Sequence, residues 1–436
     1  MLALAEAANP EWVSVPLIGW SLVAALREQA DVHLVTQVRN REAILRAGLR
    51  EGRDFTAIDS EAVARPVHRA GAFLRLGRGK GWTLVTALSA RISYPYFERL
   101  VWRQFRDRLT AGDFDVVHRI TPLTPTANSS LAPRCAALGV PFILGPLNGG
   151  VPWPPGFDRE RRREREWLSY VRGAYKLSLA RRRMLNASQV LIAASDHTAG
   201  EIPACHRAKL ARIPENGIDP SRFTARGRPR SAPPLRGCFI GRLVPYKGPD
   251  MLIEAALPHL KSGRLALDIV GSGPMEAHLH RMVEEAGVGA AVTFHGWLAH
   301  TAVQNVLARA DLLPFPSIRE FGGGVVLEAM ATGVVPVVCD YAGPGELVDA
   351  DTGYKVPIGT RGAVVAGFRD RLGEILDNPS DLPRLSDNGV RRVAERFTWE
   401  RKAAQMIDLY RWALAPSGPI PYAEAPTSLP ASGQGA

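Results

Sequence analysis

The stretch between Ser317 and Val338 restricts the fold more than any other part of the sequence. It contains three consecutive glycines near its start, then a short apolar pattern of helical period that ends at Gly333, and then the apolar run Val334 to Val338. A glycine just after a helix suits the left-handed conformation that commonly ends it. The stretch and the apolar run before it therefore predict a strand, a tight glycine loop, a helix that begins near Gly324 or Val325, and a buried strand.

A unit of this kind can bind an anion. The backbone N–H groups of the loop and the positive end of the helix point at one spot, which suits a phosphate. Glu320 lies on the loop beside that spot, and we expect Glu328 in the first turn of the helix, so that both carboxylates face one cleft. Taken alone, the pair also fits a surface loop followed by a helix carboxylate that interacts with its own N-terminus.

Length and periodicity describe an α/β protein with more than one domain. At 436 residues the chain is too long for one ordinary core. Strands alternate with helices from the start, which predicts parallel, doubly wound sheets whose ligands bind at the carboxyl ends of the strands. In the first sixty residues we expect strands at 1–7, 31–36 and 54–58 and helices at 21–29 and 41–49.

The apolar runs are far shorter than a membrane span, and Glu6 interrupts the start before a signal-like region develops, so we expect a cytoplasmic protein. The four cysteines lack CxxC spacing and predict small core thiols in a reducing compartment. Asp113-Phe114-Asp115 matches a DxD metal motif, but it opens an expected buried strand and does not lie at a loop mouth, so it gives no reason to expect a metal.

The net charge of +11 is locally concentrated, since Arg159 to Arg183 contains ten Lys or Arg and three Glu. One interpretation is a solvated helix face. The other is a surface for an anionic membrane or a phosphorylated acceptor, with Trp167, Tyr170 and Tyr175 as interfacial anchors. No recognisable nucleic-acid module accompanies the charge, so we expect no nucleic-acid partner.

Further loop motifs follow predicted strands in the second half of the chain. They are Gly241-Arg242 with Lys247-Gly248, Gly271-Ser272-Gly273-Pro274, His295-Gly296-Trp297, Gly343-Pro344-Gly345-Glu346-Leu347 and Asp351-Thr352-Gly353-Tyr354. In this order and at these spacings, together with Glu320 and Glu328, they resemble the retaining glycosyltransferases of the two-domain GT-B type, family 4 (glycosyl transferases group 1). Pro214 to Asp219 resembles the family's crossover between domains.

The resemblance implies an α/β GT-B fold, in which two Rossmann-like doubly wound domains face a central cleft. We expect an acceptor-side domain at 1–216, a nucleotide-sugar-binding domain at 217–396, and a helix at 397–414 that returns to the first domain. The tail at 415–436 is rich in Pro, Ser, Gly and Ala, and we expect it to be disordered.

The resemblance also assigns the donor site. Arg242 and Lys247 would neutralise a diphosphate, Glu328 would bind the ribose hydroxyls, and Glu320 would contact the donor sugar. The expected catalytic residues are Glu320, His118, Arg242 and Lys247. The expected donor-binding residues are Gly241, Arg242, Lys247, Gly271, Trp297, Glu320, Gly322, Gly323, Gly324, Val325 and Glu328.

On the acceptor side, His118 ends an expected strand at 114–118 and would polarise a hydroxyl. The alternative is a histidine that the backbone satisfies. Asn148 and Gly149, in a glycine-rich loop, could contact sugar hydroxyls or form a turn without a ligand. Gly19 stands where the family usually carries two glycines, and this departure weakens the acceptor-side assignment.

The resemblance implies transfer of a sugar from a nucleoside diphosphate sugar with retention. The basic, aromatic stretch suggests a saccharide or lipid-linked saccharide acceptor in envelope or exopolysaccharide biosynthesis. The nucleotide sugar is a co-substrate, and no cofactor is expected. The alternatives are a non-catalytic protein that binds a sugar nucleotide or another subunit, and a nucleotide-sugar epimerase on the same fold. With a lipid-linked acceptor, the protein would lie peripherally on the inner face of the membrane.

Overall fold

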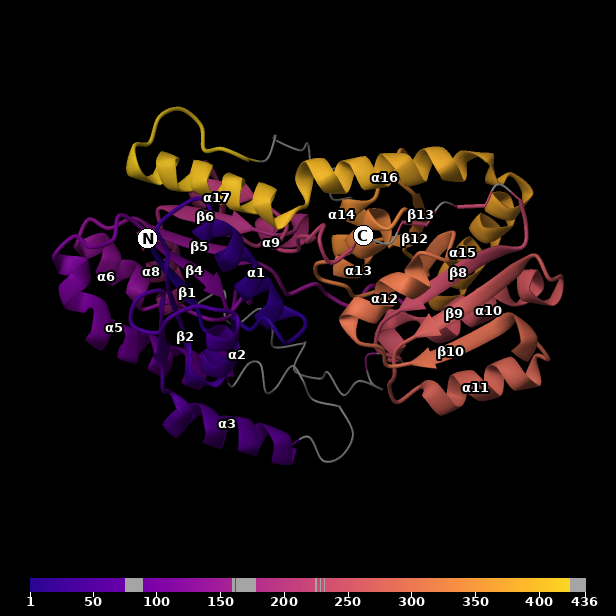
Figure 1. Ribbon diagram of the computed structural model, residues 1–436, viewed down its shortest axis with the longest axis horizontal. Helices are drawn as coiled ribbons and strands as arrows, with labels where there is room; N and C mark the ends of the chain where they lie inside the picture. The colour runs from indigo at the N-terminus through magenta and orange to yellow at the C-terminus, as the bar shows by residue number, and fades with distance from the viewer. Residues whose placement is uncertain are drawn as a thin grey trace, which may run out of the picture.

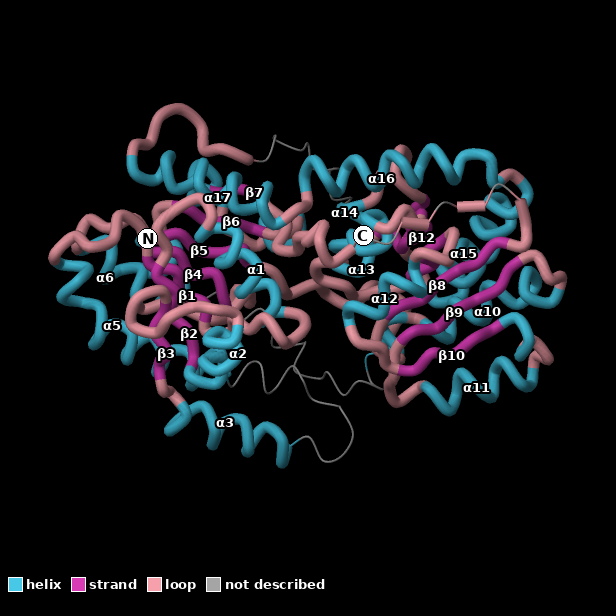
Figure 2. The backbone as a smooth tube through the Cα atoms, viewed as in Figure 1, coloured by secondary structure: helices cyan, strands magenta, loops and turns pink. Residues whose placement is uncertain are grey.

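The computed structural model describes residues 1–74, 89–158, 161, 178–223, 226–227, 229–230 and 232–423. These residues form two α/β domains side by side, each built on a parallel sheet with helices on both faces (Figure 1). Figure 2 shows the two sheets as separate sets of strands. The prediction of two Rossmann-like, doubly wound domains is confirmed.

The N-terminal sheet has seven strands in the order β3-β2-β1-β4-β5-β6-β7, and all its strand pairs are parallel. Its strands are β1 (Leu2–Ala5), β2 (His33–Gln37), β3 (Phe55–Ile58), β4 (Val117–Thr121), β5 (Phe142–Leu147), β6 (Val190–Ala193) and β7 (Leu210–Arg212). The chain runs outward from β1 to β3 and then resumes at β4 on the other side of β1. The switch point therefore lies between β1 and β4.

The C-terminal sheet has six parallel strands in the order β10-β9-β8-β11-β12-β13. They are β8 (Leu235–Ile240), β9 (Leu265–Val270), β10 (Val292–Gly296), β11 (Leu312–Phe315), β12 (Val335–Asp340) and β13 (Tyr354–Pro357). Here the order reverses between β8 and β11. In open α/β sheets the crevice outside such a switch point is where ligands bind.

The helices connect the strands and cover the sheet faces. In the N-terminal half they are α1 (Val15–Arg27), α2 (Arg41–Arg46), α3 (Glu61–Leu74), α5 (Tyr94–Thr110), α6 (Leu131–Ala137), α8 (Leu179–Ala187) and α9 (Asp196–Gly200). In the C-terminal half they are α10 (Pro249–Lys261), α11 (Glu276–Glu285), α12 (His300–Leu307), α13 (Gly324–Ala331), α14 (Ala342–Leu347), α15 (Arg361–Asp377), α16 (Leu382–Arg396) and α17 (Trp399–Leu414).

Helix α17 leaves the C-terminal domain and packs on the N-terminal sheet (Figure 1). Its buried residues Met406, Leu409 and Tyr410 join one apolar cluster with Leu22 and Val23 of α1. A separate cluster fills the opposite face of that sheet, and a third fills the C-terminal domain. The two domains are therefore tied by the crossover before β8 and by the helix that returns.

Two boundaries differ from the prediction in the first half. Helix α1 begins at Val15, six residues before the expected start, because Pro16 fits the first turn of a helix. Strand β4 runs from Val117 to Thr121, so the strand predicted at 114–118 was placed too early. Phe114 is buried before the strand begins and contacts Phe105 of α5, which explains its apolar character.

The expectation of a disordered tail from residue 415 is wrong for its first part, because the structure describes residues up to 423. Ile420 is 4% exposed and belongs to the cluster between α1 and α17. The carbonyl of Tyr422 accepts a hydrogen bond from Arg212 N at 2.8 Å, and Ala423 forms an antiparallel bridge with Ala211. The segment thus pairs with β7, the edge strand of the sheet.

Candidate active site

The predicted donor residues all follow the carboxyl ends of strands in the C-terminal sheet. Gly241, Arg242 and Lys247 lie between β8 and α10, and Gly271 follows β9. Glu320 and the glycine loop lie between β11 and α13. Because β8 and β11 are neighbours at the switch point, these loops meet at one place.

Lys247 and Glu320 are in direct contact across this switch point. Lys247 Nζ donates to Glu320 Oε2, and both side chains are mostly shielded from solvent. The same ammonium lies 5.2 Å from the ring centroid of Phe315, the last residue of β11. Arg242 is exposed and, within the described residues, forms no ion pair. The ammonium of Lys247 is therefore engaged, whereas the side chain of Arg242 is open to solvent.

The glycine loop leads directly into α13, which begins at Gly324 as predicted. Gly323 is its N-cap and adopts φ 61°, the left-handed region that favours glycine. The N–H groups of residues 322–325 have no acceptor among the described residues. They remain available for an anion, and the positive end of the helix lies behind them.

Gly322 is a glycine for a different reason, which is close packing. A β-carbon at this position would overlap Glu215 Oε1 and Asn216 Nδ2 of the crossover between the domains. The loop that carries the free N–H groups is thus held directly against the domain junction.

Two other predicted donor residues lie farther along the same edge. Glu328 is half-buried in the second turn of α13, so the expectation that it lies in the first turn is wrong by one residue. Trp297 follows β10, the edge strand, and its side chain is 70% exposed. Its indole is therefore open to solvent at the end of the sheet farthest from β13.

The structure does not present His118 to a cleft. The residue is the second of β4, fully buried, and its Nε2–H donates to the carbonyl of Gly145 at 2.6 Å. Nδ1 then accepts from the hydroxyl of Tyr410 on α17, also at 2.6 Å. Burial lowers the pKa of the imidazole to about 4. The expectation of a histidine that ends its strand and faces an acceptor is corrected by this geometry, which fits the alternative of a satisfied histidine.

The other predicted acceptor-side residues also bind protein groups. Gly19 lies inside α1, where a β-carbon would overlap the carbonyl of Ala7, so it is not part of a loop after β1. Asn148 is 6% exposed and donates to Glu215 Oε1 at 2.5 Å. Gly149 accepts a hydrogen bond from Thr198 Oγ1 at 3.3 Å. The acceptor-side expectations for Gly19 and Asn148 are therefore corrected.

The sequence analysis missed the groups that join the two domains. Glu346 of α14 accepts hydrogen bonds from Asp196 N at 3.0 Å and from Arg212 Nη2 at 2.5 Å, both in the N-terminal domain. Arg212 also pairs with the Asp196 carboxylate. Arg319, next to Glu320, is buried and donates to the carbonyl of Val151 at 3.3 Å. Glu346 could have been noticed in the sequence because it lies in Gly343-Pro344-Gly345-Glu346-Leu347, one of the motifs that resemble the family.

Two ionisable side chains are buried at the crossover itself. Glu215 is 5% exposed, and burial raises the pKa of its carboxyl group to about 7. Lys402 of α17 is 2% exposed and donates from Nζ to the carbonyl of Pro214 at 2.6 Å, and burial lowers its pKa to about 7. Glu215 could have been noticed in the sequence because it is an ionisable residue within the crossover motif.

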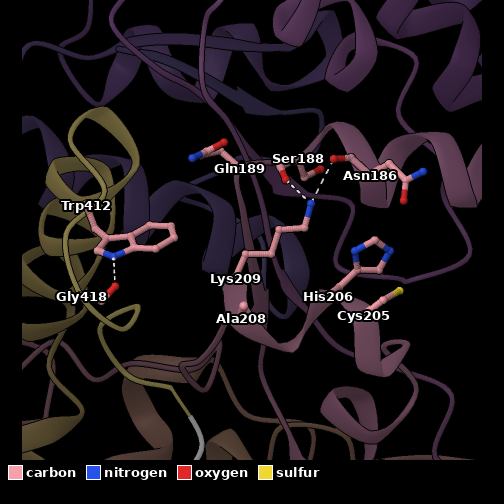
Figure 3. Close-up of a pocket in the computed structure, with 9 residues that line it drawn as sticks. All are labelled: Asn186, Ser188, Gln189, Cys205, His206, Ala208, Lys209, Trp412 and Gly418. Atoms are coloured by element: carbon pink, nitrogen blue, oxygen red, sulfur yellow. Dashed lines mark hydrogen bonds between the residues drawn. The ribbon is translucent and has the colours of Figure 1, made fainter.

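A hollow of about 590 Å³ lies elsewhere, at the β7 edge of the N-terminal sheet (Figure 3). Lys209 Nζ in its wall donates to the carbonyls of Leu185, Asn186 and Ser188 at 2.7, 3.0 and 2.7 Å. Trp412 Nε1 donates to the carbonyl of Gly418 at 3.4 Å. None of the predicted site residues lines this hollow, and the ammonium in it is already used as a helix cap.

Most of the basic stretch predicted at 159–183 lies outside the described residues. No described helix is long and apolar enough to cross a membrane. Cys135, Cys238 and Cys339 are free and buried, and Cys205 is free and exposed.

Two doubly wound domains, each built on a parallel sheet, are the architecture of GT-B proteins. The profile of the family "Glycosyl transferases group 1" matches residues 230–391. The chain is 30% identical over 312 residues to an MMP alpha-(1->4)-mannosyltransferase of Mycolicibacterium hassiacum, covering 70% of this chain and 72% of that protein. The chain belongs to this family.

A second relative is D-inositol 3-phosphate glycosyltransferase 2 of Catenulispora acidiphila, 31% identical over 252 residues, which cover 52% of this chain and 57% of the relative. The chain spans about half the length of most of the curated relatives that it matches. Among solved structures, a glycosyltransferase from Rickettsia africae superposes with a TM-score of 0.60 at 14% identity, covering 95% of this chain and 98% of that one. That likeness concerns the fold.

Proposed function

We propose that this protein is a retaining glycosyltransferase that takes a sugar from a nucleoside diphosphate sugar. The observation that carries the proposal is the contact between Lys247 and Glu320 at the switch point. It joins the loop after β8, which also carries Arg242, to the loop whose N–H groups at 322–325 have no acceptor among the described residues. Two cations and a helix N-terminus at one place favour a ligand with several negative charges close together. A diphosphate has this charge distribution.

In the proposed complex the ammonium of Lys247 binds the diphosphate and gives up part of its contact with Glu320. Glu320 then faces the sugar beside the diphosphate, and Glu328 of α13 accepts from the ribose hydroxyls. The cations stabilise the negative charge that builds on the diphosphate as the sugar leaves. Retention would follow from attack on the side from which the diphosphate departs, with a phosphate oxygen receiving the acceptor proton.

We propose a saccharide or lipid-linked saccharide as acceptor, in envelope or exopolysaccharide assembly. The support for this part is the sequence of the basic, aromatic stretch Arg159 to Arg183. Such a stretch would bring the protein to an anionic membrane surface. Binding of the purified protein to anionic liposomes at low salt tests this part, and no binding contradicts it.

A thermal-shift and hydrolysis screen against UDP-, GDP- and ADP-sugars tests the donor. We expect stabilisation by sugars of one base, with slow hydrolysis of that donor, and loss of both in Lys247→Ala. Glu320→Ala separates a transferase from a binding protein: loss of turnover with retained donor binding supports an enzyme. Stabilisation by no nucleotide sugar would overturn the proposed function.

A further inference from the structure

We propose that Glu215 is a positioning residue of the donor site: its carboxyl group joins Asn148 of the N-terminal domain to the glycine loop at Gly322. This inference rests on the proposed function, because it concerns the loop that would hold the diphosphate. Glu215 was not among the residues that the sequence analysis assigned to the site. Its role would be to fix the loop, and it would not touch the sugar nucleotide.

The contacts of one carboxyl oxygen, Glu215 Oε1, carry the inference. Asn148 Nδ2 donates to Glu215 Oε1 at 2.5 Å, and Ser195 Oγ holds Asn148 Oδ1 at 3.3 Å. Gly322 packs against the same oxygen, so tightly that an added β-carbon would overlap Oε1 and would lie 2.7 Å from Glu215 Cδ. A shift of this carboxyl group would therefore move Gly322, the first of the residues 322–325 whose N–H groups would bind the anion.

The second oxygen of Glu215 is shielded from solvent. Oε2 is buried and has no hydrogen-bond partner within the described part of the chain. Among the described residues, Lys402 of α17 and Glu320 of the loop after β11 act electrostatically on the carboxyl group. Lys402 already donates to the carbonyl of Pro214, and Glu320 carries the same charge as an ionised Glu215.

Burial favours the neutral carboxylic acid and raises its pKa to about 7, with a smaller effect of Glu320 in the same direction, against the opposing effects of Lys402 and of the hydrogen bond from Asn148. Ionisation would place a negative charge against Gly322, at the start of the loop that receives an anionic donor. The repulsion would act over a few ångströms of low-dielectric protein. Donor affinity should therefore fall as the pH rises through about 7, while the fold is kept.

The test is the affinity for the nucleotide sugar found in the screen, measured by calorimetry between about pH 6 and pH 8. An intact nucleotide sugar is the right probe, because its diphosphate has no ionisation in this range. Wild-type protein should lose about fivefold to tenfold in affinity across the range. Glu215→Gln, which mimics the neutral acid, should bind at pH 8 as well as the wild type does at pH 6. Glu215→Ala, which removes the support, should bind about tenfold more weakly throughout.

Glu98→Gln is the matched control. Glu98 is also fully buried with a raised pKa, but it accepts hydrogen bonds from Ser129 and Ser130 in the N-terminal core. This variant should keep the wild-type pH dependence. The inference is overturned if the wild type shows no fall, if Glu215→Gln shows the same fall, or if Glu215→Ala binds like the wild type. No binding of any nucleotide sugar by the wild type would instead overturn the proposed function.

Discussion

The ammonium of Lys247 and the carboxylate of Glu320 form an ion pair that joins the loop after β8 to the loop after β11. The two strands are neighbours, but the residues are far apart in the sequence. The carboxylate of Glu320 neutralises the charge of Lys247 beside the N–H groups of residues 322–325, which have no acceptor among the described residues. A bound diphosphate would compete with Glu320 for this ammonium.

Lys247→Ala should weaken nucleotide-sugar binding by about 10- to 100-fold, the value of a charge-assisted hydrogen bond of about 1.5–3 kcal/mol. The competition just described predicts that Glu320→Gln binds the donor at least as tightly as the wild type, since it frees the ammonium. Calorimetry on both variants checks this. Equal weakening in the two variants would show that the ion pair itself must persist in the complex.

Gly322→Ala should reduce donor affinity about tenfold and stability by about 1–3 kcal/mol, because the added methyl group overlaps Glu215 and Asn216. The matched control is Gly362→Ala in α15, where an added β-carbon would meet nothing within 4 Å. Alanine suits a helix better than glycine, so the control should be neutral or stabilising. Nucleotide-sugar titrations and thermal unfolding of both variants provide the comparison, and a Gly322 variant that behaves like the control would refute the close packing.

The backbone of the glycine loop and of α13 could be predicted from the sequence because its signals are local. Three glycines, a short apolar helix pattern and Gly333, which has φ 81°, lie within a few residues of one another. Each restricts the backbone without help from distant parts of the chain. The N-cap of α9 is equally local, because the side chain of Ser195 accepts from Thr198 N three residues later.

The acceptor-side residues were misjudged because their environments are built from distant segments. His118 owes its hydrogen bond to Tyr410, 292 residues away on a helix that returns from the other domain. Asn148 is occupied by Glu215 of the crossover. A loop residue that looks free for a sugar is indistinguishable, in sequence, from one that joins two domains.

His118 makes the stability of the fold dependent on pH. In the unfolded chain the imidazole takes a proton below about 6.5, whereas the pKa in the folded protein is about 4. The unfolded state therefore binds more protons between these values, and stability falls as the pH drops from about 6.5 toward 4. The shift corresponds to about 3 kcal/mol for this group.

His118→Phe should remove that slope and should destabilise the protein by about 2–3 kcal/mol at neutral pH, because it leaves the Gly145 carbonyl and the Tyr410 hydroxyl unpaired. Urea unfolding of the wild type and of the variant across this pH range gives the contribution of His118 as the difference between their free energies of unfolding. The pH profile of turnover above pH 6 should not change in the variant. A shifted profile would mean that the imidazole reaches the substrate in the complex.

The segment after α17 should contribute measurably to stability, although its composition predicted disorder. A chain that ends at Ala415 loses the burial of Ile420, worth about 2 kcal/mol, and the hydrogen bond from Arg212 N to the carbonyl of Tyr422. It also uncovers the edge of β7, and an uncovered edge can pair with another chain. We expect a lower unfolding midpoint and a greater tendency to aggregate than in a chain that ends at Ala423, which keeps these contacts. Thermal unfolding and light scattering on the two truncations make the comparison. Identical behaviour would show that the contacts of residues 416–423 add nothing to the fold.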